Sequence, residues 1–90
     1  MDDLSLVSYA LRAKNRVRIM SALKDGRKIS AQLEKETGMY KSHISRTLQE
    51  LKNKKIIRCV NPNDRAFRFY ELTAAGRKVL SKAKEIKQSL

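Results

Sequence analysis

Two short helical patterns, separated by one glycine, occupy residues 30–54 of this chain. Gly38 stands between them, and a glycine at that place can adopt the left-handed conformation that ends a helix. In the second pattern Ile44, Leu48 and Leu51 recur at spacings of four and three residues, which places their side chains on one face of a helix. Two helices joined by so short a turn predict a helix-turn-helix at the centre of the fold.

The opposite face of the second helix is polar. At about 100° per residue, Ser42, Arg46, Gln49 and Asn53 lie opposite the apolar face. On most amphipathic helices such a face is simply solvated, whereas in a DNA-binding helix-turn-helix the second helix lies in the major groove. The charge of the whole chain favours the second interpretation.

The chain carries a large excess of positive charge. Twenty-one Lys and Arg against nine Asp and Glu give a formal net charge of +12 over 90 residues, with a pI near 10.3. Residues 12–28 hold seven basic and one acidic side chain, residues 41–58 hold six and one, and residues 77–87 hold five and one. This charge favours nucleic acid as the partner. A membrane-surface helix is not expected, because residues 77–87 lack bulky aromatic side chains.

The remaining spacings predict a mainly helical fold with one small β-hairpin. Ninety residues form one domain over residues 1–90, with helices at about 3–13, 15–25, 30–37, 40–54 and 73–89. The expected N-caps are Asn15, Ser30 and Thr73, and the expected end of the second helix is Asp25-Gly26.

The hairpin follows the second helix of the helix-turn-helix. Strands are expected at about 56–61 and 66–72, where "IIRCV" and "AFRFYEL" flank the turn-rich "NPNDR". Pro62 fixes its own φ and suits a turn, so the tip is expected between Asn61 and Arg65, with the arginine projecting from it. Both faces of the second strand carry aromatic residues, which packing beneath the second helix of the helix-turn-helix or contact with a partner would explain.

Three segments, over about residues 15–80, resemble a known arrangement in the same order. They are "NRVRIMSALKDG", "GMYKSHISRTLQELKNKKII" and "NPNDRAFRFYELTAAGRKVL", which include Ser45-Arg46, Asp64-Arg65 and Leu72-Thr73. They resemble the second helix, the recognition helix and the wing of winged-helix transcription regulators of the ArsR and MarR type. The resemblance implies a winged helix-turn-helix and a prokaryotic, dimeric DNA-binding protein. It also implies a recognition helix in the major groove and wing arginines in the minor groove.

The sequence departs from this family pattern at several positions. The Cys-x-Cys pair and the His and Asp ligands of metal-sensing members are missing, so neither a metal effector nor a cofactor is expected. The only cysteine, Cys59, is expected to be a small buried hydrophobe. Tyr40 replaces a capping Ser, and is expected to reach a phosphate or to be partly buried. Lys55 replaces a Gly at a site that favours positive φ.

The predicted DNA contacts fall into three groups. The side chains expected at base edges are Ser42, His43, Ser45, Arg46 and Gln49. Those expected at phosphates are Lys41, Lys52, Lys54, Lys55 and either Arg16 or Arg18. The wing, at residues 61–66 and just beyond, contributes Arg65 and Arg68.

The two terminal helices are expected to form a homodimer. Their apolar side chains extend beyond the needs of a minimal winged helix, and the predicted interface residues are Leu4, Val7, Leu11, Leu80, Ala83, Ile86 and Leu90. The predicted function is that of a sequence-specific, double-stranded DNA-binding transcriptional regulator. A low-specificity architectural DNA-binding protein and a winged-helix module of a protein or RNA assembly remain the alternatives.

No enzyme is expected, because the chain has one histidine, no acidic pair at a useful spacing and no glycine-rich phosphate loop. The longest apolar runs are a few residues long and the N-terminus is acidic. A cytoplasmic protein without a membrane span or secretory signal is therefore expected.

Overall fold

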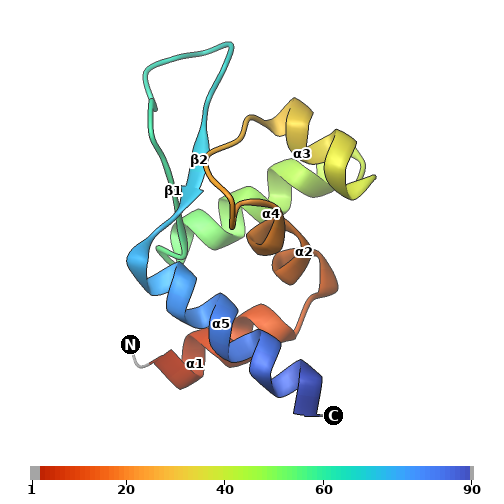
Figure 1. Cartoon of the computed structure of the whole chain (residues 1–90). Coiled ribbons are helices and arrows are strands. Elements are labelled where there is room, and N and C mark those ends of the chain that lie inside the picture. Colours follow the sequence, from red (N-terminus) through yellow and green to blue (C-terminus); the bar gives the residue numbers. More distant parts are fainter. Residues whose placement is uncertain (1–2, 90) are drawn as a thin grey trace.

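A computed structural model describes residues 3–89 of the chain. The elements in order are α1 (Asp3–Leu11), α2 (Lys14–Ala22), α3 (Ser30–Thr37), α4 (Lys41–Asn53), β1 (Ile57–Cys59), β2 (Tyr70–Leu72) and α5 (Ala74–Ser89). Figure 1 shows α1 and α5 side by side at one end and the β1–β2 hairpin projecting at the other. The predicted mainly helical, winged helix-turn-helix fold is confirmed.

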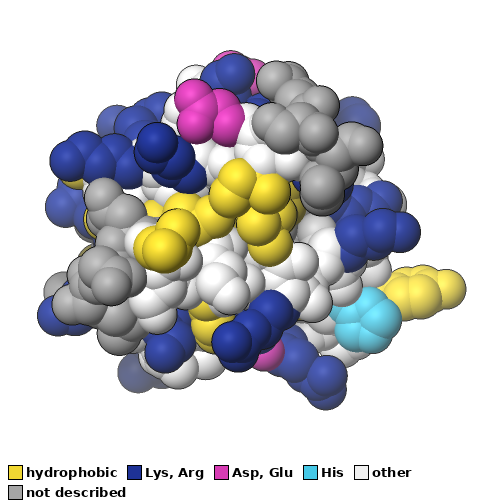
Figure 2. Space-filling view, turned by 90° about the horizontal axis from the view of Figure 1, so that it is seen from below, with side chains coloured by type: hydrophobic (Ala, Val, Ile, Leu, Met, Phe, Trp, Pro, Cys, Tyr) yellow, Lys and Arg dark blue, Asp and Glu magenta, His cyan; other side chains and the backbone are white. Residues whose placement is uncertain are grey.

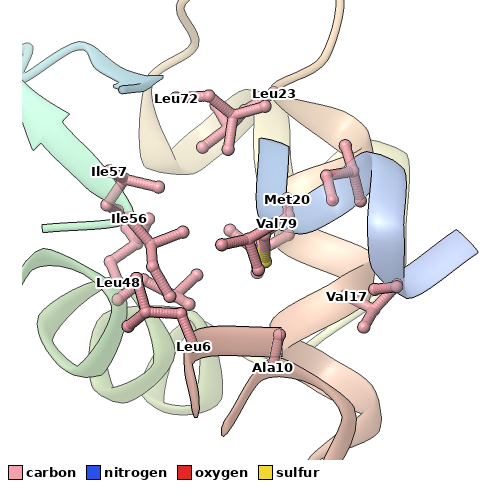
Figure 3. Packing of buried hydrophobic residues seen from close by; sticks show 14 of the residues in the cluster. Leu6, Ala10, Val17, Met20, Leu23, Leu48, Ile56, Ile57, Leu72 and Val79 are labelled. Carbon is pink, nitrogen blue, oxygen red and sulfur yellow. The ribbon is translucent and has the colours of Figure 1, made fainter. Parts of the chain in front are cut away.

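One hydrophobic core holds the helices together (Figure 3). The predicted apolar face of α4 is confirmed, because Ile44, Leu48 and Leu51 are all buried. They pack in one cluster with Ile19 of α2, with Leu23 at the C-cap of α2, and with residues from every other element. Among the described residues, no helix has the length and apolar character needed to cross a membrane.

The turn of the helix-turn-helix depends on Gly38, as predicted. Its φ of 72° is left-handed, and its N–H donates to the Glu34 carbonyl at 2.9 Å, which closes α3. Tyr40 then begins α4 without a side-chain cap. The predicted loss of a cap at this position is therefore confirmed.

Two other predicted caps are wrong. Asn15 lies inside α2, whose N-cap is Ala13 in an extended conformation. Ser30 is the first residue of α3, and Ile29 is the N-cap, with its N–H donating to Gln32 Oε1 at 3.0 Å. The physical reason at α3 is a β-bridge between Lys28 and Tyr70, which keeps the chain extended up to the residue before the helix.

The strands are shorter than predicted. The register pairs Ile57 with Leu72 and Cys59 with Tyr70, and residues 60–69 form the rest of the wing. Asn61 explains the early end of the ladder, because its side chain bonds across the wing in place of backbone pairing. Its Nδ2 donates to the Phe67 carbonyl, and its Oδ1 accepts from the Phe69 N–H, both at 2.7 Å.

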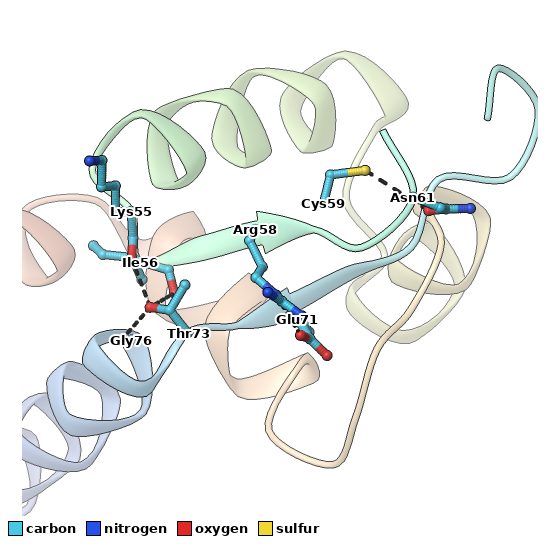
Figure 4. Close-up of polar contacts among 8 residues, drawn as sticks. All are labelled: Lys55, Ile56, Arg58, Cys59, Asn61, Glu71, Thr73 and Gly76. Atoms are coloured by element: carbon cyan, nitrogen blue, oxygen red, sulfur yellow. Dashed lines mark hydrogen bonds and ion pairs between the residues drawn. The ribbon is translucent and has the colours of Figure 1, made fainter. Parts of the chain in front are cut away.

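Thr73 joins the segment after α4, the wing and α5 at one point (Figure 4). Its predicted capping role is confirmed, because Oγ1 accepts from the Gly76 N–H at 3.0 Å. The single O–H of the same hydroxyl is shared between the carbonyls of Lys55 and Ile56, at 2.7 and 3.0 Å. Lys55 has a φ of 60°, as predicted for a site where the family pattern has glycine. The end of α4 is thereby fixed against the start of α5.

The terminal helices bury part of the predicted dimer interface within one chain. Val7, Leu80 and Ala83 are buried in the core, because α1 and α5 pack against each other. Leu80 and Ala83 are therefore packed within one chain and are not offered to a second subunit, whereas Val7 still lines the groove between α1 and α5. Leu4 and Ile86 stay exposed, at 76% and 40%, whereas Leu90 lies outside the described residues.

Candidate nucleic-acid interface

The polar face of α4 points away from the core. The predicted contact residues exposed on it are Lys41, Ser42, His43, Ser45, Arg46, Gln49 and Lys52. Gln49 is oriented by its neighbour one turn on, since its Nε2 donates to Asn53 Oδ1 at 3.0 Å. The amide has two N–H donors, so one donor and the carbonyl oxygen remain available for a partner.

An aromatic pair stands at the N-terminal end of α4. Tyr40 is 76% exposed, so its predicted partly buried packing role is wrong. Its ring meets the His43 ring edge to face, with the centroids 5.9 Å apart and an interplanar angle of 75°. Both side chains are thereby presented at the end of the helix that enters a groove first in DNA-binding helix-turn-helix proteins.

The wing is held in one shape by its own side chains. Asp64 accepts the N–H groups of Ala66 and Phe67, both at 2.8 Å, and these bonds lower the pKa of its carboxyl. The Asp64 carbonyl accepts from Arg68 Nε at 2.9 Å. Arg65 is exposed at the tip, as predicted. Phe67 is 60% exposed.

A groove of about 440 Å³ separates the wing from the helix-turn-helix. Its basic lining residues are Lys41 of α4 with Arg65 and Arg68 of the wing, and Glu34 of α3 is the acidic one. A second hollow adjoins it and is lined by Ser45, Gln49 and Lys52 of α4. Ser30, Arg68 and Tyr70 line both hollows, so the wing and the side of α4 that faces it form one continuous surface.

Two of the predicted phosphate contacts face other parts of the chain. Arg16 is used within the fold: it donates to the Tyr9 carbonyl at 2.6 Å and to Glu50 at 3.4 Å, and lies 3.7 Å from the Tyr9 ring centroid. The Lys54 ammonium lies 5.1 Å from the same ring. Arg18 is exposed and donates to the Thr37 carbonyl at 3.3 Å. Of the two arginines, Arg18 is therefore the more accessible to a phosphate, because it is exposed, whereas Arg16 is held by Tyr9 and Glu50.

No group of three or more His, Cys, Asp or Glu side chains is arranged to hold a metal ion in the described part of the chain. Cys59 is half-buried, with its Sγ 4.0 Å from Asn61 Oδ1, so the predicted burial is only partial. Sequence reasoning missed the Lys28–Tyr70 bridge and the place of Glu34 in the groove. Both depend on segments distant in sequence, and neither has a local signal.

Residues 4–90 match one protein family, described as the HVO_A0261 N-terminal domain. No protein among those with curated descriptions matches the chain. Solved structures of several proteins are similar to it in fold. The transcriptional regulator BldR from Sulfolobus solfataricus is 24% identical with a TM-score of 0.73, over 81% of this chain and 53% of BldR.

A MarR-family transcriptional regulator from Enterococcus faecalis V583 is 17% identical with a TM-score of 0.80, over 94% of this chain and 79% of that one. The homodimeric winged helix-turn-helix DNA-binding domain of Mb0332 from Mycobacterium bovis is 23% identical with a TM-score of 0.71, over 98% and 78%. The chain thus spans about half the length of BldR and most of the other two. The shared fold is the winged helix-turn-helix.

Proposed function

The chain belongs to the HVO_A0261 N-terminal domain family, and we propose that it binds specific sequences of double-stranded DNA and regulates transcription. One observation carries this proposal: part of the exposed polar face of α4, from Lys41 to Lys52, and the arginines of the wing line two adjoining, mainly basic hollows. The likeness to BldR, a transcriptional regulator, and to the DNA-binding domain of Mb0332 supports the same function.

The side chains of α4 suit the major groove. Arg46 offers the planar pair of donors that guanine O6 and N7 accept. Gln49 offers one donor and one acceptor to adenine, because its bond to Asn53 uses only one N–H. Further base contacts are proposed for Ser42, His43 and Ser45, and phosphate contacts for Lys41, Lys52, Lys55 and Arg18.

Selection of bound sequences from random duplexes, followed by titration of Arg46→Ala, tests the function. We expect the variant to lose about ten- to a hundredfold in affinity for the selected duplex and much less for a scrambled one. Arg77→Ala, which removes an exposed arginine of α5, is the matched control and should keep the preference. Equal wild-type affinity for selected and scrambled duplexes would instead indicate an architectural protein. Preferential binding of RNA would indicate an assembly module.

The wing is proposed to enter the minor groove. Arg65 is exposed at the tip of a loop held by Asp64 and Asn61, so little ordering is needed on binding. We expect Arg65→Ala to weaken binding about five- to tenfold where A·T-rich sequence flanks the major-groove site, because a narrow minor groove attracts arginine. The measurement is a pair of titrations on duplexes with A·T and G·C flanks. The same loss on both duplexes would make Arg65 a phosphate contact only.

A homodimer is proposed, with a smaller interface than the sequence suggested. Leu4, Leu11 and Ile86 line a shallow groove of about 340 Å³ between α1 and α5. Figure 2 shows this end of the molecule, where hydrophobic side chains gather at the centre with Lys and Arg around them. A two-fold pair would set two recognition helices about 34–36 Å apart, on a palindromic site.

The dimer is tested with Ile86→Asp. Placing a carboxylate in the apolar patch should convert the wild-type dimer into a 10.4 kDa monomer at micromolar concentration, as measured by sedimentation. Ser81→Asp, at an exposed site of the same helix outside the patch, should remain dimeric. A monomeric wild type, or an intact Ile86→Asp dimer, contradicts the proposed interface.

A further inference from the structure

We infer that Tyr40, held by His43, selects thymine by contact with the C5-methyl group in the major groove, an inference that rests on the proposed function. The edge-to-face ring pair places an apolar aromatic surface at the first turn of α4. None of the other side chains proposed for base contacts on α4 offers an apolar surface of this size.

Tyr40 adds little to the stability of the fold. It occupies the N-cap of α4, where Ser, Thr, Asp or Asn normally accepts a free backbone N–H, yet its side chain makes no capping bond. Its ring is 76% exposed, so it also buries little apolar surface. A position that gives up a cap and leaves a large ring in water fits a contact made with a partner.

The contact with His43 favours one orientation of the Tyr40 ring. The centroids lie 5.9 Å apart at 75°, a geometry in which the edge of one ring meets the face of the other. Because this arrangement exists in the free protein, the ring does not need to be ordered on binding. His43 therefore acts as a positioning residue for Tyr40, beside its own proposed base contact.

The chemistry of the groove identifies the target. The edges of the bases in the major groove are donors and acceptors, except for the methyl group at C5 of thymine. An aromatic surface at the leading end of α4 is complementary to that methyl group. The phenolic hydroxyl is not required for this contact, which separates it from a phosphate bond.

The test replaces single thymines of the selected duplex by uracil, which removes only the methyl group. Wild-type protein should lose about three- to fivefold in affinity at one thymine position of each half-site. Tyr40→Phe should keep this difference, because the ring remains. Tyr40→Ala should bind thymine and uracil duplexes equally, and Phe67→Ala, which removes an exposed wing aromatic, should keep the wild-type difference.

Different results of these titrations would contradict the thymine contact and the proposed function. Wild-type protein that prefers the selected duplex but is indifferent to every uracil replacement overturns the thymine contact alone. The thymine contact is also overturned if Tyr40→Ala keeps the full preference for thymine over uracil duplexes. It is overturned as well if Tyr40→Phe loses that preference, which would indicate a phosphate bond through the hydroxyl. A wild type without preference for the selected duplex overturns both the contact and the proposed function.

Discussion

Gly76→Ala should destabilise the protein by about 3 kcal/mol, although alanine favours a helix over glycine by about 1 kcal/mol. The reason is a close backbone approach. A Cβ at Gly76 would overlap the Ile56 carbonyl oxygen and lie 3.0 Å from its carbonyl carbon. Because that oxygen belongs to the backbone, the clash cannot be relieved by a change of rotamer.

Moving the Ile56 carbonyl would also break the junction around it. This oxygen accepts from both the backbone N–H and the hydroxyl of Thr73, each at 3.0 Å. Each such bond contributes about 1 kcal/mol, so their loss adds to the strain of the overlap. The start of α5 would separate from the wing, and the core beneath Ile56 would open.

Urea unfolding of the wild type and of Gly76→Ala measures the difference in their free energies of unfolding. Gly38→Ala is the control for a backbone cost without a clash: its φ of 72° is left-handed, unlike that of Gly76, and no atom lies within 4 Å of the added Cβ. Gly38→Ala should lower the free energy of unfolding by only about 1–2 kcal/mol, because alanine is strained in a left-handed conformation. A Gly76→Ala variant as stable as wild type would show that α5 can move away from Ile56 freely.

The affinity for the selected duplex should fall about a thousandfold between 50 and 200 mM salt, the behaviour expected for six or more neutralised phosphates. The exposed cations proposed to contact phosphates are Lys41, Lys52, Lys55 and Arg18 on each subunit. A dimer therefore offers enough charge for this number. The measurement is a series of equilibrium titrations, plotted as log affinity against log salt.

Single substitutions show how much each lysine contributes to the slope of log affinity against log salt. Lys52→Ala should reduce it by about one for each subunit that contacts DNA, whereas Lys78→Ala on α5 should leave it unchanged. Both lysines are exposed, so their substitution should not disturb the core. A slope near zero for the wild type would mean that the positive charge of the chain is not used in binding DNA.

Local patterns predict much of this fold. The spacing of Ile44, Leu48 and Leu51 is enough to predict α4 and its buried face, because a helix surrounded by water can bury only one side. Gly38 and Thr73 likewise act within a few residues of their own position, at a helix end and a helix start. The face of α4 opposite the core follows from the same spacing.

Features that depend on distant segments could not be predicted in this way. The Lys28–Tyr70 bridge keeps the chain extended up to Ile29, so Ile29 and not Ser30 is the N-cap of α3, and nothing near Lys28 indicates a strand partner. Arg16 has the sequence features of a free cation, but the fold places it between Tyr9 and Glu50. Likewise, the apolar pattern of α1 and α5 does not indicate whether these side chains pack within one chain or against a second subunit.

The central claim is that α4 and the wing form the surface that binds DNA. Adding the selected duplex to ¹⁵N-labelled protein, and following each backbone amide by NMR, tests it most directly. The largest shifts should fall in Lys41–Asn53 and in residues 60–69, with small changes in α5. Shifts concentrated on α1 and α5, with α4 unchanged, would contradict the account.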